Sequence, residues 1–235
     1  PRLFADDGGP DHVFHQFRGK TELLYHLLCR CVLPVAAGGL EVDVVFVDTD
    51  YSLDMFRLVS ILDNRLNAAL RSCLSRLLVV HCCSSSQLLL TFHFLETTLS
   101  SRPSVALLLI DSISAFYWPD RSEGGASVTR QEEKLSKCSE LMARLDYRIT
   151  IFATCHTIRR SSSGPSSSSS ASEPDRSYLC RSWQRLVTHR LLCSRQEAEN
   201  KSRQVFSVHC SSSWMGTKAS RVSSFTVTDG GVEFT

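Results

Sequence analysis

The sequence lacks the cysteine spacing of a zinc site and the long apolar run of a membrane span. Its ten cysteines include no C-x-x-C pair, which excludes the usual structural zinc site. The longest apolar run, Val105–Ile110, is far shorter than the roughly 20 residues of a membrane-spanning helix, and no signal-peptide pattern occurs. We therefore expect buried, reduced thiols in an intracellular protein.

A strong net charge is also missing. The net charge of +2 produces no global field that favours a nucleic acid or a membrane surface. Positive charge is instead concentrated from Arg159 to Arg203, a stretch with nine lysines and arginines but four acidic residues. Residues 161–172 within it contain nine serines and no large apolar side chain, so we expect a mobile loop over residues 159–179.

One glycine is missing from a phosphate-binding pattern. Phosphate loops follow G-x-x-x-x-G-K-[ST], and here the window ends in Gly19, Lys20 and Thr21 but begins with Phe14. The lysine would reach the β- and γ-phosphates and the threonine hydroxyl would hold Mg²⁺. Backbone N–H groups must curl around the phosphates in a conformation that a Cβ obstructs. The remnant therefore indicates either a nucleotide-binding family or a chain that no longer binds nucleotide well.

Apolar runs without alternation and helical segments with an apolar stripe follow one another along the first 154 residues. This alternation predicts an α/β fold, with a mainly parallel sheet covered by helices on both faces. The first 12 residues are polar and turn-rich, which predicts a flexible N-terminal segment. We expect helices at Lys20–Val32, Ser52–Leu66, Gln87–Leu99 and Thr129–Leu145, and strands at Val42–Asp48, Leu77–Cys82, Val105–Asp111 and Ile149–Thr154.

Short strand-like runs follow the serine-rich stretch and predict an antiparallel extension of the same sheet. They are Leu186–Leu192, Gln204–His209, Phe225–Thr228 and Val232–Phe234. We expect a single core domain over residues 1–235. The alternative is that the serine-rich loop links to a second domain, although residues 173–235 offer few apolar side chains for a separate core.

Carboxylates follow two of the predicted strands. Asp48 and Asp50 come at the end of one, and Asp111 ends another. Ligands of open parallel sheets bind at the carboxyl ends of the strands. Nucleotide hydrolysis requires one carboxylate near Mg²⁺, which suits Asp111, and a polar group that orients water, which suits Asp50. The alternative is that these aspartates cap loops or the next helix.

Three segments carry a resemblance to a known family: Gly19–Leu27, Gly39–Tyr51 and Leu108–Trp118. Together they resemble the RecA-type recombinases, and more narrowly the paralogues of the eukaryotic strand-exchange recombinase. The resemblance extends from Leu3 to Thr235. It implies a RecA-like P-loop core without the small N-terminal helical domain, and a nuclear role in homologous-recombination repair of DNA double-strand breaks.

The family pattern also implies roles for individual residues. Lys20 and Thr21 match the phosphate and Mg²⁺ residues, and Asp111 matches the second metal-site carboxylate. Asp50 occupies the position of the catalytic glutamate, and His156 that of a glutamine that senses the γ-phosphate. The implied cofactors are ATP and Mg²⁺, bound weakly.

The implied partners are DNA and other recombinase paralogues. The resemblance places the chain in a hetero-oligomeric complex, with the D paralogue as direct neighbour, on single-stranded or branched DNA. Tyr117–Ala126 and the loop from Arg159 to about Leu179 match the two DNA-contacting loops. The candidate contacts are Arg159, Arg160, Arg176, Tyr178 and Arg181, and the rings of Tyr178 and Trp183 offer stacking surfaces. The alternative is that the arginines after residue 180 are ordinary surface residues.

Two further departures from the family pattern bear on activity. Asp50 is one methylene shorter than glutamate, and a misplacement of about 1 Å costs roughly a hundredfold in rate. His156 does not reproduce the donor and acceptor of a planar amide. We therefore expect an interaction subunit with a degenerate ATP site. The alternatives are a competent DNA-dependent ATPase and an unrelated P-loop nucleotide enzyme.

Overall fold

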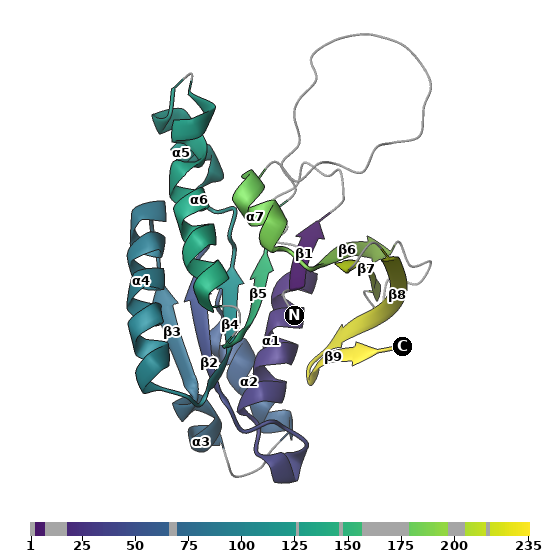
Figure 1. Cartoon of the computed structure of the whole chain (residues 1–235). Helices are drawn as coiled ribbons and strands as arrows, with labels where there is room; N and C mark the ends of the chain where they lie inside the picture. The colour runs from purple at the N-terminus through teal and green to yellow at the C-terminus, as the bar shows by residue number, and fades with distance from the viewer. Residues whose placement is uncertain are drawn as a thin grey trace, which may run out of the picture.

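A single nine-stranded sheet forms the centre of the protein. The computed structural model describes residues 3–7, 18–65, 70–125, 127–145, 148–156, 179–196, 205–214 and 217–235. Within these residues the strand order is β3-β2-β4-β5-β1-β6-β7-β8-β9. The sheet continues without a break from the parallel strands into the antiparallel ones, which curl away beside α1 (Figure 1).

The parallel part of the sheet runs from β3 to β6, and the last three strands are antiparallel. This arrangement confirms the mainly parallel sheet and its antiparallel extension. In chain order the strands are β1 (Leu3–Asp7), β2 (Asp43–Asp48), β3 (Leu77–His81), β4 (Val105–Asp111), β5 (Thr150–Thr154), β6 (His189–Gln196), β7 (Val205–Trp214), β8 (Thr217–Thr228) and β9 (Gly231–Phe234).

Helices cover both faces of the parallel strands, as the sequence predicts (Figure 1). On one face lie α1 (Arg18–Val32), α2 (Met55–Arg65) and α3 (Leu70–Ser75). On the other lie α4 (Ser85–Ser101), α6 (Val128–Leu145) and α7 (Arg181–Leu186). The short helix α5 (Tyr117–Glu123) packs at one end of α6, and a 3₁₀ turn, η1 (Val35–Ala37), follows α1.

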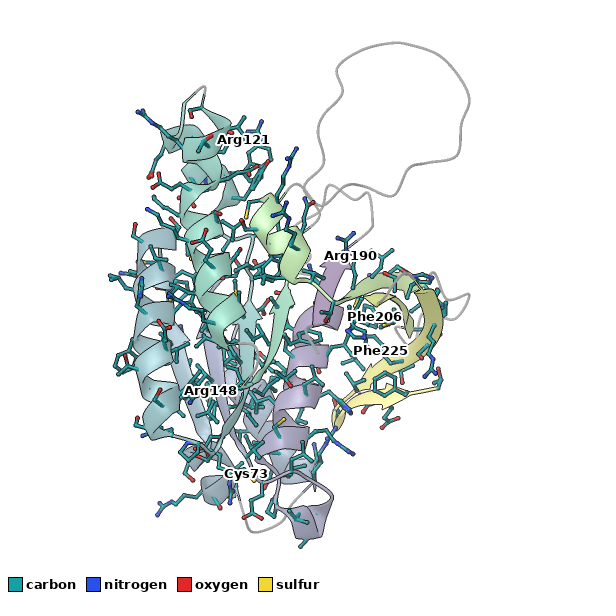
Figure 2. All side chains as sticks on the ribbon, in the orientation of Figure 1. Cys73, Arg121, Arg148, Arg190, Phe206 and Phe225 are labelled. Atoms are coloured by element: carbon teal, nitrogen blue, oxygen red, sulfur yellow. The ribbon has the colours of Figure 1, made fainter. Side chains whose placement is uncertain are left out.

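The strand sequences read as unbroken apolar runs because both faces of each strand are buried. In β2, Val45 and Val47 pack beneath α4 and α6, whereas Val44 and Phe46 pack beneath α1 and α2. All four are at most 1% exposed. Two aromatic residues of the antiparallel strands, Phe206 and Phe225, stack with their ring centroids 5.2 Å apart (Figure 2). They belong to the same apolar core as the buried residues of α1 and α2.

The structure differs from the sequence predictions in three places. Residues 3–7 are strand β1 rather than part of a loop, because β5 and β6 pair with them on both sides and override their weak strand propensity. Tyr117–Glu123, expected within a DNA-contacting loop, is helix α5, which packs on α6. Leu186 ends helix α7, so the strand expected from Leu186 begins only at His189.

The cysteines agree with a reduced interior. All ten are free thiols, and seven of them are buried. Burial raises the pKa of the Cys29 and Cys138 thiols to about 12, which keeps them protonated and unreactive. No helix among the described residues is long and apolar enough to cross a membrane.

Candidate nucleotide site

The carboxyl ends of β2, β4 and β5 meet at one edge of the sheet, where α1 begins. Asp48, Asp111 and Thr154 are the last residues of these strands, and Lys20 and Thr21 lie in the first turn of α1. The sequence predicts this meeting, because ligand sites of parallel sheets form where the strands end. Side chains from four separate segments therefore share one small region.

Asp111 is the centre of this region. Its Oδ2 accepts hydrogen bonds from Thr21 Oγ1 at 3.2 Å and from Ser52 Oγ at 2.7 Å, and its Oδ1 accepts one from Thr154 Oγ1. The residue is 5% exposed. Three hydroxyl groups thus hold a buried carboxylate beside the first turn of α1. The two residues predicted to share a Mg²⁺ ion, Thr21 and Asp111, are in direct contact.

Lys20 lies beside the same edge but is turned toward β5. Its Nζ donates to the Cys155 carbonyl at 3.1 Å and lies 3.4 Å from His156 Nδ1. The side chain is 4% exposed. The ammonium group therefore already has protein partners at the place where the family pattern puts phosphate oxygens.

His156 connects Lys20 to Asp50. Its Nε2 lies 2.9 Å from Asp50 Oδ2, and its backbone N–H donates to Ser114 Oγ at 2.9 Å. Burial raises the pKa of Asp50, but hydrogen bonds from His156 and Ser112 outweigh that effect and hold the pKa below its ordinary value. Asp50 is thus an ionised carboxylate engaged by an imidazole. The residues predicted as base and sensor contact each other.

Asp48 has the structural role that the sequence left open for strand-end aspartates. It is 1% exposed and accepts hydrogen bonds from the backbone N–H groups of Ser52 and Leu53, at 3.0 and 3.3 Å. These bonds fix the turn after β2 and so hold the Ser52 hydroxyl against Asp111. Asp48 therefore supports the site indirectly, by fixing the backbone that positions Ser52.

Glu22, the residue after Thr21, links α1 to α2 and, through Arg57 of α2, to the hairpin formed by β8 and β9. Its carboxylate accepts two hydrogen bonds from Arg57, from Nε at 2.9 Å and from Nη2 at 3.0 Å. The same guanidinium donates to the carbonyls of Thr228 at 2.6 Å and Asp229 at 2.8 Å. The start of α1 is therefore fixed by a bidentate ion pair in which Glu22 is buried.

Gly19 also has a packing role. A Cβ built on it would lie 2.9 Å from Cδ1 of Phe206, which is closer than real Cβ contacts come. A glycine is therefore needed here for the close approach of α1 to β7, whether or not a phosphate binds. The start of the pattern, including Phe14, lies outside the described residues.

The residues present fit a magnesium nucleotide better than a metal bound by protein alone. The described residues contain no cluster of three or more histidine, cysteine or carboxylate side chains that would hold a metal ion. The hydroxyl of Thr21 and the carboxylate of Asp111 are hard oxygen ligands of the kind that Mg²⁺ prefers. Such a pair needs phosphate oxygens and water to complete the coordination.

The candidate DNA contacts fall mainly outside the described residues, which exclude Arg159, Arg160, Arg176 and Tyr178. Arg181 is exposed at the start of α7. Trp183, expected to offer a stacking ring, is 5% exposed and packs in the core. This prediction is wrong, because Trp183 occupies the inward face of α7.

The sequence reasoning missed Ser52, Thr154 and Cys155. Ser52 and Thr154 hold the carboxylate of Asp111, and Cys155 contributes its carbonyl to Lys20. Thr154 and Cys155 stand where β5 ends, and this position alone could have marked them. The role of Ser52 depends on the turn that Asp48 fixes, for which the sequence carries no comparable signal.

Comparison with known proteins adds family membership to this geometry. Residues 8–213 match the Rad51 family. The chain is 46% identical to the DNA repair protein XRCC2 of Mus musculus, in an alignment that covers 100% of this chain and 90% of the relative. It is 26% identical to the XRCC2 homolog of Arabidopsis thaliana, over 89% of this chain and 75% of the relative.

More distant relatives are named as meiotic recombination proteins. The meiotic recombination protein DMC1/LIM15 homolog of Homo sapiens is 28% identical, over 60% of this chain and 42% of the relative. The parallel sheet, the carboxylate at the end of β4 and the hydroxyl at the start of α1 agree with these matches. With most of its length matched by the family and a close relative aligned from end to end, the chain belongs to the Rad51 family.

Proposed function

We propose that this protein acts in homologous-recombination repair of DNA double-strand breaks, as a subunit of a complex of recombinase paralogues with a degenerate ATP site. The names of its relatives support the repair role, since one is a DNA repair protein and others are meiotic recombination proteins. In this proposal the described elements form one RecA-like core domain, and the protein acts in the nucleus.

One observation carries the nucleotide part of the proposal: Thr21 and Asp111 are in contact beside the buried ammonium of Lys20. These three residues would hold the phosphates of ATP and its Mg²⁺ ion. The bound nucleotide would supply a phosphoanhydride bond whose hydrolysis can drive conformational change. The scaffold of a nucleotide site is therefore kept, and the same elements also support the fold.

Three features argue that hydrolysis is weak. The pattern lacks its first glycine at Phe14, so the backbone donors for the phosphates are compromised. Asp50 is short for a catalytic base and is engaged by His156 at 2.9 Å. Lys20 already contacts Cys155 and His156, and these contacts compete with a phosphate. Each change alone lowers the rate, and together they favour a docking role over catalysis.

A competent ATPase is the second candidate. It is favoured by the contact between Thr21 and Asp111, which places a hydroxyl and a carboxylate together as a magnesium nucleotide would need them. Against it stands the hydroxyl network around Asp111, which gives this carboxylate a structural role of its own. The two candidates differ in one measurable quantity, the affinity for Mg²⁺–ATP.

Titration with Mg²⁺–ATP separates the candidates. For the docking subunit we expect weak binding that changes less than about threefold in Lys20→Ala. For the competent ATPase, binding is tight and falls by at least tenfold in Lys20→Ala but less in Lys20→Arg, which keeps the charge. In parallel, the proposal requires that the chain co-purify with a recombinase paralogue, and both variants should do so. A chain that captures no paralogue contradicts the proposed complex.

The proposal also specifies the partner protein and the type of DNA that is bound. We assign the D paralogue as direct neighbour and single-stranded or branched DNA as ligand. Arg181, exposed at the start of α7, is the described candidate for a phosphate contact. Arg181→Ala should weaken DNA binding uniformly across sequences and lower its salt dependence. Unchanged binding in this variant excludes Arg181 from the DNA contact.

A further inference from the structure

A cavity of about 210 Å³ lies between α4, α5, α6 and the start of α7. Its apolar walls include Leu88, Ile113, Phe116 and Leu135. Pockets for drug-sized ligands are usually larger, roughly 300–1,000 Å³, so this one suits a compact group. The Rad51-type site assigned above uses none of the residues that line it.

A buried carboxylate faces this cavity. Asp120 lines it and is 8% exposed. Its Oδ1 accepts hydrogen bonds from Ser85 Oγ at 2.6 Å and from Lys134 Nζ at 3.1 Å. No described residue donates to its Oδ2, and this oxygen is not fully buried. Because Asp120 lines the cavity, Oδ2 can accept a hydrogen bond from a ligand there.

The charges around the cavity favour a cation over an anion. Two carboxylates, Asp120 and Glu132, line it together with one basic side chain, Arg121. The guanidinium of Arg121 donates to the Tyr117 hydroxyl at 2.6 Å and lies over the rings of Tyr117 and Trp118. Lys134 contacts Asp120 but does not line the cavity, and it also pairs with Glu123 at 2.9 Å.

We propose that this cavity binds a compact cationic group, an amidinium, guanidinium or ammonium on a short apolar stem, with the cation donating to Asp120 Oδ2. The apolar walls would bury the stem, and a charge-assisted hydrogen bond would fix the head. The same chemistry fits a free small molecule and an arginine side chain of another protein.

Benzamidine is the probe for the site, with benzoate as the anion of matching shape. On the full chain, isothermal titration should show benzamidine binding in the millimolar range or tighter, and benzoate at least tenfold weaker. N-acetyl-arginine amide forms a second arm. Tighter binding of this blocked arginine than of benzamidine assigns the site to a protein side chain, and the reverse assigns it to a free small molecule.

Asp120→Asn replaces one carboxylate oxygen with an amide N–H donor, so benzamidine affinity should fall by at least tenfold. Glu123→Gln is the matched control, because Glu123 also pairs with Lys134 but does not line the cavity. The affinity of this variant for benzamidine should equal that of the wild type. If Asp120→Asn fails to fold, Val128→Arg decides, because Val128 lines the cavity and is 62% exposed. Benzoate binding equal to benzamidine, or wild-type affinity in the folded pocket variant, overturns the proposal.

Discussion

Thr21 donates a hydrogen bond to Asp111 across 3.2 Å, although 90 positions separate the two residues in the chain. The contact joins the first turn of α1 to the end of β4, and Ser52 and Thr154 donate to the same carboxylate. Asp111 is therefore both the candidate metal ligand and the acceptor that holds three segments together. Substitution can separate these two roles.

Asp111→Ala should lower the free energy of unfolding by about 1–3 kcal/mol, because it removes the acceptor of the buried Thr154 hydroxyl and of the half-buried hydroxyls of Thr21 and Ser52. Thr21→Val removes one donor of nearly the same shape at a half-buried position, and we expect a loss below about 1 kcal/mol. Urea denaturation followed by circular dichroism measures both. An equal loss in the two variants contradicts the view that Asp111 holds several segments.

The contact between Asp50 and His156 should make the free energy of unfolding depend on pH in the acid range. The folded-state pKa of Asp50 lies below its ordinary value of 3.8. The ionised carboxylate therefore contributes stability above the unfolded-state pKa, and this contribution is lost as the pH falls through the folded-state pKa. We expect Asp50→Asn to be less stable than the wild type at pH 6, with the difference shrinking as the pH falls through the folded-state pKa of Asp50.

Denaturant unfolding of both proteins between pH 2.5 and 7 checks this expectation. His156→Ala should show the same pH range for its loss, since it removes the hydrogen-bond partner of Asp50 at 2.9 Å. A stability difference that persists unchanged into the lowest pH would show that Asp50 acts through its shape rather than its charge.

Substitution of Arg57 should destabilise the protein, because its guanidinium joins Glu22 of α1 to the turn between β8 and β9. Arg57→Ala leaves the buried carboxylate of Glu22 without its bidentate partner, and removing one member of a buried pair costs about 3–5 kcal/mol. Because Arg57 itself is 21% exposed in its side chain, we expect a loss near the lower limit. Thermal and urea unfolding measure the loss.

The double variant Arg57→Ala with Glu22→Gln supplies the control. Neutralising Glu22 removes the unpaired charge, so the double variant should be more stable than Arg57→Ala alone. If it is less stable, the unpaired charge of Glu22 is not what destabilises Arg57→Ala, and the lost contacts of Arg57 with the carbonyls of Thr228 and Asp229 account for that loss instead.

Ser84 should contribute the cap of α4. Its side chain accepts a hydrogen bond from the backbone N–H of Gln87, and its extended backbone is typical of the N-cap position. Ser84→Ala should cost about 1 kcal/mol in unfolding free energy. Ser86→Ala, an exposed neighbour in the first turn, is the matched control and should change stability by less than about 0.5 kcal/mol. Equal effects would argue against the cap.

Strong apolar patterns made most of the parallel core predictable. Val105–Asp111 matches β4 at both ends, and the helix expected at Thr129–Leu145 begins one residue earlier in the structure. Patterns of this kind are local, because each strand or helix is specified by its own buried faces.

Features that depend on distant partners were not predictable. Leu3–Asp7 becomes a strand only because β5 and β6, made much later in the chain, lie on its two sides. In the site, Lys20, Thr21, Asp50, Asp111 and His156 were named from the sequence, and the fold brings them together. The orientation of Lys20 toward Cys155 depends on side-chain packing, for which no sequence pattern exists.

The position of β1 has a consequence for how the chain folds. Strand β1 sits between two strands that lie 149 and 186 positions further along the chain, as the pairs of Leu3 with Phe152 and with His189 show. Such long-range pairing is slow, so residues 3–7 stay unpaired until nearly all of the sheet exists. Their insertion completes the sheet, and a change that hinders it should leave the antiparallel strands poorly joined to the parallel ones.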